Sequence, residues 1–375
     1  MSKLLDAPVL RLGPLSRVHP RVHACTLTAR LGTCATSEEV VQVVAEAQVV
    51  AATCLGSSDA VLARRAFDVC IIDEASQITV PTCLGPLRLA DRFVMIGDHH
   101  QLTPLVRDTD AAQHGMSVSL FQRLCKAHPS SVAMLCTQYR MNADIMALSN
   151  ALVYDGRLVC GNESVACAKF TMKRDACPSW LWDVLDPARP AVFVDTDAVK
   201  AVESRADTLV ENRVEAEWIV RMSDVLIQAN VAAADIGILT PYRQQAKLLR
   251  DRCACEVLTV DQAQGRDWPV VLVSLVRSNK THTVGELLRD QRRVNVMITR
   301  AKTKLVLVGS YSTMIHGPCT EPMPALLPLL RIIQPKEPAD IPVHVSPGRQ
   351  RYVKKARRPT PVVTDLLNEQ DCIAE

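Results

Sequence analysis

The stretch FDVCIIDEASQ (Phe67–Gln77) joins a short apolar run to two adjacent carboxylates, Asp73 and Glu74. A nearly continuous apolar run of this length is typical of a strand buried on both faces of a parallel sheet. Two neighbouring carboxylates repel each other, and they are costly to desolvate without a positive partner. The stretch therefore predicts a strand of an α/β fold whose end faces a cation.

Apolar runs of the same kind recur along the chain. They are RFVMIGD (92–98), AVFVDT (191–196), DIGILTP (235–241), PVVLVSLVRS (269–278) and KLVLVGS (304–310). Helical patterns separate them: within residues 211–229, apolar side chains three to four apart are Val214, Trp218, Met222 and Val225. Pro241 follows a run and suits the first turn of a helix that reaches Arg250. Strands alternating with helices predict two α/β domains with parallel sheets.

Composition narrows the class of protein. The 375 residues are 48% hydrophobic and 22% charged, as in ordinary soluble globular proteins, and a net charge of +3 gives no general indication of nucleic-acid binding. The 14 cysteines include no C-x-x-C pair, which favours reduced thiols in a cytosolic or nuclear protein. No window reaches the about 18 uninterrupted apolar residues of a membrane span, so we expect no membrane association.

The ends of three runs carry candidate site residues. Ligands of parallel sheets bind beyond the carboxyl ends of the strands, which are marked here by Asp73-Glu74, by Gly97-Asp98 with Gln101, and by Thr240-Pro241. One carboxylate suffices to hold a hydrated Mg²⁺ ion, so we expect Asp73 to bind Mg²⁺ and Glu74 to activate a water. Taken alone, a surface Asp-Glu pair at a strand end stays an alternative.

The order of the motifs points to a family. After IIDEA come GDHHQLTP (97–104), QYRMN (138–142), PYRQQ (241–245), TVDQAQGRD (259–267) and RRVNVMITRAK (292–302). Over residues 50–310 the chain resembles superfamily-1 helicases of the up-frameshift-like group, and within it the helicase half of the eukaryotic replication helicase–nuclease. The resemblance implies two RecA-like, parallel-sheet lobes of the P-loop NTPase type, the first of them incomplete.

The same resemblance implies a role for each matching residue. Catalysis falls on Glu74 as general base, Gln101 near the γ-phosphate, Arg140 at the phosphates and Arg300 as the arginine finger. ATP contacts fall on Tyr139, Gln264, Gly265 and Asp267, and the metal contact on Asp73. Apart from the resemblance, single-strand grooves combine phosphate contacts with stacking side chains. The candidate nucleic-acid contacts in PYRQQ are Pro241, Tyr242 and Arg243, although core packing stays an alternative for Tyr242. The implied cofactors are ATP and Mg²⁺.

Three segments are expected: a partial first lobe at 1–118, a second lobe at 119–313, and a Pro-rich, basic and disordered tail at 314–375. The tail contains RQRYVKKARR (349–358), with six basic residues and no acid. A solvated tail is the ordinary interpretation of such a run, and a nuclear-import or phosphate-contacting patch is the alternative.

The family's phosphate-binding loop, G-x-x-x-x-G-K-[ST], is missing from this sequence because no glycine precedes a lysine. We therefore expect an N-terminally truncated first lobe that exposes apolar edge and face and does not fold cleanly. Losing three phosphate donors costs about 5–9 kcal/mol, so we also expect poor ATP hydrolysis. The nuclease half is expected to be absent as well, since no E-x-K or D-x-K triplet occurs and cysteines for its 4Fe-4S cluster are not identifiable. Ala263 and Met297 depart from the family pattern.

Three functions follow as hypotheses. The first is the C-terminal helicase portion of an ATP-dependent DNA helicase/nuclease of replication and repair, moving 5′ to 3′ on single-stranded DNA. The second is a non-catalytic nucleic-acid-binding or regulatory module. The third is a related helicase that acts on RNA. The implied partners are single-stranded DNA, with RNA left open, and replication and repair proteins. The implied location is the nucleus, with cytoplasm and mitochondrion as alternatives.

Overall fold

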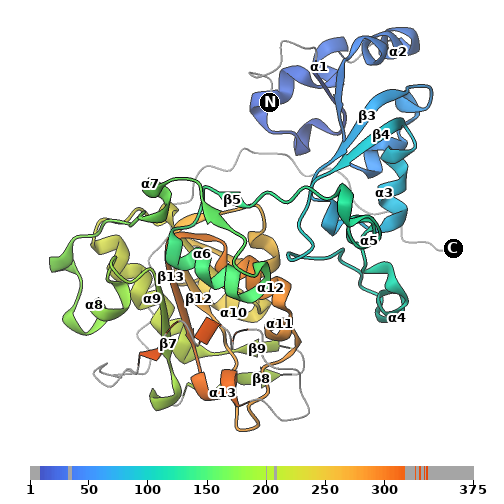
Figure 1. The fold of residues 1–375 in the computed structure, drawn as a ribbon. Coiled ribbons are helices and arrows are strands. Elements are labelled where there is room, and N and C mark those ends of the chain that lie inside the picture. Colours follow the sequence, from blue (N-terminus) through green and yellow to red (C-terminus); the bar gives the residue numbers. More distant parts are fainter. Residues whose placement is uncertain are drawn as a thin grey trace. The chain divides into compact units, whose positions relative to one another are not determined.

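The largest sheet lies in the second half of the chain and has six strands, all parallel, in the order β11-β10-β12-β13-β7-β14. Figure 1 labels three of its strands, β7, β12 and β13. Its strands are β7 (Ala191–Asp195), β10 (Ile236–Thr240), β11 (Glu256–Thr259), β12 (Trp268–Ser274), β13 (Ala301–Gly309) and β14 (Pro335–Lys336). β10, β12 and β13 are buried almost throughout because helices cover both faces. This part of the sheet matches the predicted strands with two buried faces.

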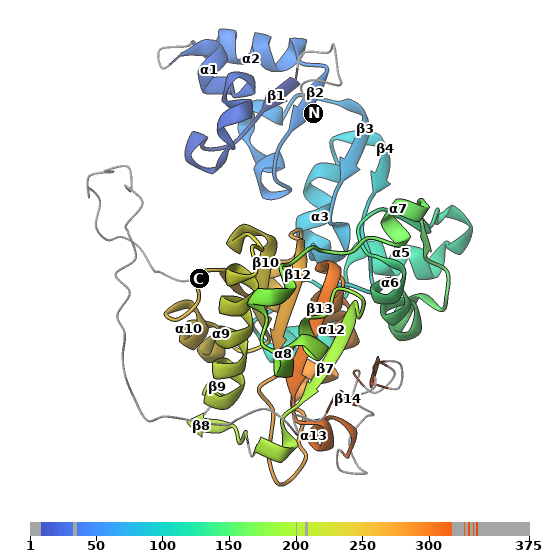
Figure 2. The ribbon, with the colours of Figure 1, turned by 90° about the vertical axis from the view of Figure 1, so that its left-hand side faces the viewer.

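The helices of this half lie on the two faces of the sheet. Their bounds are α6 (Ala143–Ser149), α7 (Glu163–Ala166), α8 (Ser179–Leu185), α9 (Arg213–Gln228), α10 (Arg243–Arg250), α11 (Glu286–Arg289), α12 (Gln291–Ile298) and α13 (Tyr311–Ile315). α6 and α12 pack on one face through a core that includes Ile145, Val271, Val296 and Leu305. α9 and α10 lie along the opposite face (Figure 2).

The first part of the chain holds two small parallel sheets. β1 (Val9–Arg11) pairs with β2 (Val49–Ala51), and β3 (Phe67–Ile72) pairs with β4 (Ala90–Met95). The helices here are α1 (Leu27–Leu31), α2 (Ser37–Glu46), α3 (Val80–Leu87), α4 (Thr109–Ala111) and α5 (Leu120–Ala127). One small core surrounds β1 and α2, and another joins Ile72 of β3 to Cys83 of α3.

The prediction that β3 and β4 are buried on both faces is wrong. One face packs against α3 and α5 through Ile72, but the other carries Val69, Ile71 and Val94 with exposed fractions of 44%, 66% and 50%. The register pairs Ile71 with Val94, so these side chains form one apolar surface. Within the described residues no element covers that surface, which confirms the expectation of an exposed apolar face on the first lobe.

Two further pairs of short strands complete the secondary structure. β5 (Thr137–Gln138) pairs in parallel with β6 (Val159–Cys160), and β8 (Ser204–Ala206) pairs antiparallel with β9 (Leu209–Glu211). Along the described chain, no helix combines the length and the apolar character that crossing a membrane requires. The cysteines among the described residues form no disulfide.

The apolar runs predicted as strands all form strands, and the α/β class with parallel sheets is confirmed. Two local predictions need correction. Pro241 precedes the N-cap of α10, Tyr242, instead of lying in the first turn. The buried stripe of α9 includes Glu215 and Ser223, whereas the predicted Val214 and Val225 are only half-buried. Glu215 bonds to Ser274 at the end of β12, and the Ser223 hydroxyl donates to the carbonyl of Val220 within the helix.

The computed structural model describes residues 9–32, 36–199, 201–206, 209–316, 326, 329–330, 333 and 335–336, and these described residues fall within one compact unit. The basic cluster at 349–358 and most of the predicted tail at 314–375 lie outside the described residues. The predicted boundary between lobes at 118/119 stays a prediction.

Candidate functional site

The two carboxylates of the opening stretch follow β3 and face solvent. Oδ1 of Asp73 accepts a hydrogen bond of 2.9 Å from the amide of Glu74, and the Glu74 carboxylate accepts one of 2.8 Å from Nε2 of Gln77. Glu74 has a φ of 51°, a left-handed conformation that a non-glycine residue rarely adopts. Because both residues are exposed, the pair fits a hydrated Mg²⁺ ion held through one carboxylate.

The loop after β4 is held tightly by its own aspartate. Asp98 accepts hydrogen bonds from the amide of His100 at 2.9 Å, from Nε2 of Gln101 at 3.0 Å and from the hydroxyl of Tyr154. Burial, with the nearby Asp98 charge, raises the pKa of Tyr154, and burial with the neighbouring His99 lowers the pKa of His100. Gln101 is therefore fixed by Asp98 in the turn that follows the strand.

Helix α12 contacts the same loop. Nε of Arg292 donates to the carbonyl of His99 at 3.1 Å, and Nδ2 of Asn295 donates to the carbonyl of His100 at 3.0 Å. Asn295 also donates to the Tyr154 hydroxyl at 3.0 Å. The RRVNVMITRAK motif thus holds the GDHHQ loop through backbone carbonyls, a role that the sequence analysis did not assign to Arg292 or Asn295.

Arg300 lies between α12 and β13 and is only 2% exposed. Its three guanidinium nitrogens donate to the carbonyl of Val296, the carbonyl of Arg266 and the hydroxyl of Thr299 at 3.0, 3.2 and 2.9 Å. Burial and the nearby positive charge of Arg140 lower the pKa of Arg300 to about 10, and Asp267 and Glu74 offset part of this. Among the described residues no carboxylate forms a salt bridge with Arg300, so this buried cation lacks a paired anion.

One carboxylate, Asp267, serves two of the cations around Arg300. Its oxygens lie 3.2 Å from Nε of Arg140 and 2.6 Å from Nζ of Lys302. Burial alone would raise the pKa of Asp267, but the hydrogen bond and charge of Lys302, aided by Arg140, hold it below the ordinary value. With Arg300, three cations surround one anion, and the excess positive charge suits a phosphate group.

Tyr139 has an exposed aromatic ring, and Gln264 has a side-chain amide without a hydrogen-bond partner among the described residues. Tyr139 is 68% exposed, and its ring covers Gly161, where a Cβ atom would lie 2.1 Å from the ring. Both polar atoms of the Gln264 side chain are buried without a hydrogen-bond partner in the described part of the chain. Gly265 follows with a φ of 76° in the connection that leads to Asp267.

The predicted nucleic-acid residues lie at the carboxyl end of β10. Arg243 is exposed, while Pro241 and Tyr242 are half-buried. Burial raises the pKa of the Tyr242 hydroxyl, which faces Arg277. Tyr242 therefore presents only part of its ring to solvent.

The predicted site residues fall into two groups. Arg140, Asp267 and Arg300 come together where β12 and β13 begin, whereas Pro241, Tyr242 and Arg243 lie where β10 ends. Because all strands of the sheet are parallel, the first group lies at the amino ends of the strands and the second group at the carboxyl ends. Asp73, Gln101 and Pro241 lie beyond the carboxyl ends of their strands, whereas the Arg300 group lies at the amino ends of β12 and β13. Lys302, which sequence reasoning missed, lies inside the quoted RRVNVMITRAK motif.

Comparison with known proteins supports the motif analysis. The chain is 44% identical over 315 residues to DNA replication ATP-dependent helicase/nuclease JHS1 of Arabidopsis thaliana, covering 82% of this chain and 24% of that protein. It is 43% identical over 341 residues to DNA replication ATP-dependent helicase/nuclease DNA2 of Homo sapiens, covering 85% of this chain and 32% of that protein. The chain thus spans about a quarter to a third of the length of these relatives. The predicted resemblance is confirmed.

Two family models described as AAA domain match the chain, over residues 23–108 and 116–312. The first match contains Asp73, Glu74 and Gln101, and the second contains the group around Arg300 and the residues that end β10. Since the second match alone covers more than half of the chain, this protein belongs to the AAA domain family.

Proposed function

We propose that this chain is the helicase portion of an ATP-dependent DNA helicase/nuclease of replication and repair, which couples ATP hydrolysis to movement on single-stranded DNA. The observation that carries the proposal is the buried Arg300, which has no paired anion among the described residues and lies beside Arg140, Asp267 and Lys302. A buried cation without an anion is costly, and a nucleotide phosphate would supply the missing charge.

The proposed roles are those that the family resemblance implies, and the geometry supports them. Glu74 acts as general base on a water, and Gln101, fixed by Asp98, positions that water near the γ-phosphate. Arg140 and Arg300 stabilise the charge that develops on the phosphates during transfer. Asp73 holds Mg²⁺, which when bound neutralises phosphate charge. The electrostatic influence of Glu74 on Arg300 supports placing the two residues at one nucleotide.

Two of the remaining nucleotide contacts use an exposed ring and a side-chain amide that has no hydrogen-bond partner among the described residues. The exposed ring of Tyr139 provides a stacking surface for adenine. The unpartnered amide of Gln264, with Gly265 beside it, links the nucleotide to the nucleic acid, and Asp267 lies near the ribose. At the carboxyl ends of the strands, the contacts to single-stranded nucleic acid come from Pro241, Tyr242 and Arg243. Movement from 5′ to 3′ is proposed from the family resemblance.

Two features favour a second candidate, a non-catalytic nucleic-acid-binding module. The sequence holds no Gly-Lys pair from which a phosphate-binding loop could be built. The exposed face of β3 and β4 shows that this two-stranded sheet does not bury all of its apolar side chains. We therefore propose that residues 1–375 alone hydrolyse ATP poorly while retaining phosphate and single-strand binding. An RNA substrate remains a third candidate.

The cellular setting is part of the proposal. The relatives' names describe proteins of DNA replication. From this we propose action in the nucleus, together with replication and repair proteins, with cytoplasm and mitochondrion as alternatives. The nuclease activity in those names, and the 4Fe-4S cluster of the family's nuclease half, are not assigned to any residue of this chain.

The test measures phosphate and strand binding by purified 1–375. Tripolyphosphate is titrated calorimetrically into wild type, Arg140→Gln and, as a matched control, Arg64→Gln, whose exposed side chain has no proposed role at the site. Loss of one charge-assisted contact is expected to weaken binding about 10–100-fold for Arg140→Gln and not for Arg64→Gln. A labelled oligothymidylate and its RNA counterpart then compete for the protein. If wild type binds neither tripolyphosphate nor either strand at low salt, the proposal is wrong.

A further inference from the structure

Val276 lies in a strained turn just after β12. Its φ of 72° is unfavourable for a residue with a branched Cβ. The amide of Arg277 donates to the carbonyl of Leu275 at 2.8 Å, which closes a three-residue turn around Val276. A γ-turn with positive φ is the rarer and more strained form. Such strain persists only where the surrounding structure fixes the backbone, and it is concentrated at functional positions.

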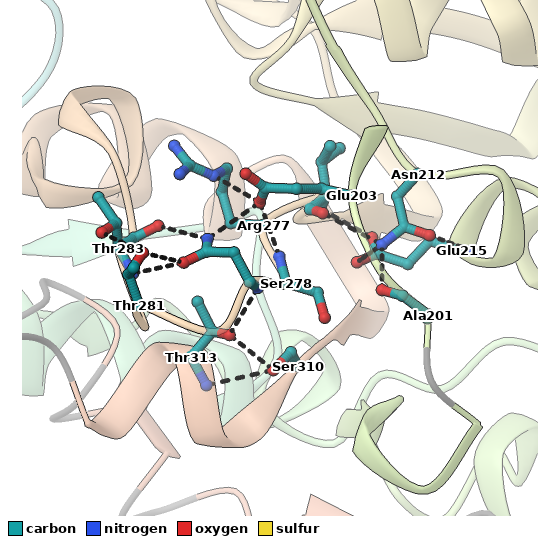
Figure 3. A network of polar contacts seen from close by, with 12 residues as sticks. Ala201, Glu203, Asn212, Glu215, Arg277, Ser278, Thr281, Thr283, Ser310 and Thr313 are labelled. Carbon is teal, nitrogen blue, oxygen red and sulfur yellow. Dashed lines mark hydrogen bonds and ion pairs between the residues drawn. The ribbon is translucent and has the colours of Figure 1, made fainter. Parts of the chain in front are cut away.

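Two side chains at the start of α9, Asn212 and Glu215 (Figure 3), hold both polar backbone groups of Val276. Oε2 of Glu215 accepts a hydrogen bond from the Val276 amide at 2.7 Å, and Nδ2 of Asn212 donates to the Val276 carbonyl at 3.1 Å. Asn212 and Glu215 also bond to each other at 3.1 Å, and neither is exposed to solvent. Asn212 is the N-cap of α9, so the helix start and the strained turn are fixed together.

The same network reaches the helix that begins after Tyr242. Gln245 of α10 is fully buried. Its Oε1 accepts a hydrogen bond from the backbone amide of Asn212 at 2.8 Å, and its Nε2 donates to the hydroxyl of Ser274 at 3.0 Å. The Ser274 hydroxyl donates to Glu215 at 2.7 Å. The end of β12 and the start of α10 are therefore tied to one pair of side chains.

The residues after the turn pack against Tyr242. Glu203 accepts hydrogen bonds from Nε of Arg277 at 2.8 Å and from the amide of Ser278 at 2.9 Å (Figure 3). A Cβ atom on Gly285 would lie 2.3 Å from Nη1 of Arg277 and 3.1 Å from the hydroxyl of Tyr242. The Arg277 guanidinium and the Tyr242 hydroxyl thus both lie next to Gly285, so loop 276–285 packs against the side chain of Tyr242.

We propose that Asn212 and Glu215 are positioning residues for single-strand binding, because they hold the strained turn that places loop 276–285 against Tyr242. This inference rests on the proposed function, in which Tyr242 and Arg243 contact single-stranded DNA. The basic side chains of Arg243 and of Lys280, in the loop, are both exposed. A phosphate backbone requires such cations in a fixed arrangement, and the clamp on Val276 supplies that arrangement.

The main test is Glu215→Gln in the full chain. The substitution keeps the shape but places an amide NH₂ group where an oxygen accepts hydrogen bonds, opposite either Val276 or Asn212. Asp224→Asn, an exposed acid-to-amide change on the same helix, is the matched control. Binding of a fluorescein-labelled oligothymidylate of about 20 nucleotides is measured by anisotropy at low salt, with hydrogen exchange of the 275–285 amides as second readout.

The expected result is about tenfold weaker strand binding for Glu215→Gln, the factor that corresponds to about 1.4 kcal/mol. Exchange in 275–285 should be faster, and the control should match wild type. Adding Val276→Gly should recover most of the lost affinity, because glycine adopts positive φ without strain and needs no clamp. If Glu215→Gln does not fold, Asn212→Ser, which keeps an N-cap oxygen and loses the donor to Val276, gives the decisive measurement.

The outcomes separate the two proposals. Wild type that binds the strand, with folded Glu215→Gln or Asn212→Ser variants that bind equally well, overturns the positioning role and leaves the proposed function standing. Weaker binding that Val276→Gly does not restore also overturns it, because the clamp would then act on something other than the turn. Wild type that fails to bind the strand at low salt refutes the proposed function itself.

Discussion

Lys304 should make the stability of the second lobe depend on pH above neutrality. The residue lies within β13 and is fully buried, and its Nζ donates to the carbonyls of Asp186 at 3.1 Å and Arg189 at 2.6 Å. Burial lowers the pKa of Lys304 from the ordinary 10.5 to about 7, and the nearby Asp186 carboxylate offsets only part of this. The folded protein therefore holds an uncharged amine in mildly alkaline solution.

The sign and size follow from proton linkage. Because the folded pKa is lower than the unfolded one, the unfolded chain binds an extra proton between the two values, and stability rises with pH in that window. The stabilisation is full above the unfolded pKa and is lost as the pH falls through about 7. A full proton difference gives a slope of about 1.4 kcal/mol per pH unit, or about 3 kcal/mol over two units.

Urea unfolding of wild type, Lys304→Met and Lys126→Met at several pH values from about 8 to about 10 tests this. Lys126 is exposed and is the matched control. Burial raises the pKa of Glu215 to about 8, so that carboxyl adds a slope of opposite sign at the lower end of this range in all three proteins. Slopes from other groups are shared by all three proteins and cancel in the difference. Lys304→Met should lack the lysine slope, and equal slopes in wild type and Lys304→Met would refute the reasoning.

Three further outcomes are expected. Gly285→Ala should lower the free energy of unfolding by about 1–3 kcal/mol in urea titrations, because φ is 82° and the new Cβ would lie 2.3 Å from Nη1 of Arg277. The control Gly156→Ala, where φ is 74° and no atom lies within 4 Å of the new Cβ, should lower it less. Equal losses of stability in the two variants would contradict the steric argument. Ile71→Ser, at a site 66% exposed, should change stability by no more than about 0.5 kcal/mol while reducing fluorescence of a bound apolar dye, and an unchanged dye signal would show that the β3–β4 face is not the binding surface. Asp267→Asn should tighten tripolyphosphate binding at low salt by removing the one anion among the cations, and calorimetry showing weaker or unchanged binding would contradict an anion site there.

Strand positions were predictable because they depend on local composition. The run at 269–278 and the run at 304–310 became neighbouring strands, since β-branched residues favour extended chain and burial on both faces. The runs at 67–73 and 92–98 also became strands, yet their burial was predicted wrongly. Burial depends on which other segments are present to cover a face, and a strand's own residues do not contain that information.

The site was predictable only to the extent that motifs mark it. The order of the motifs identified Arg140, Asp267 and Arg300, and the structure places them together. Their position at the strand starts, and the part that Lys302 takes, depend on how the chain returns from β11 to β12. The spacing of motifs in the sequence does not indicate whether a residue in a connection lies at the amino or the carboxyl ends of the strands.

By itself the sequence determined the α/β class, the strands and the family, because apolar periodicity and motif order are properties of the chain alone. Tertiary structure decided the rest. Glu215 looked like one acid among several at the start of a helix, and Val276 like an ordinary strand residue. Only the packing of α9 against the end of β12 turns them into a clamp and a strained turn, because the hydrogen bonds that join them span residues far apart in the sequence.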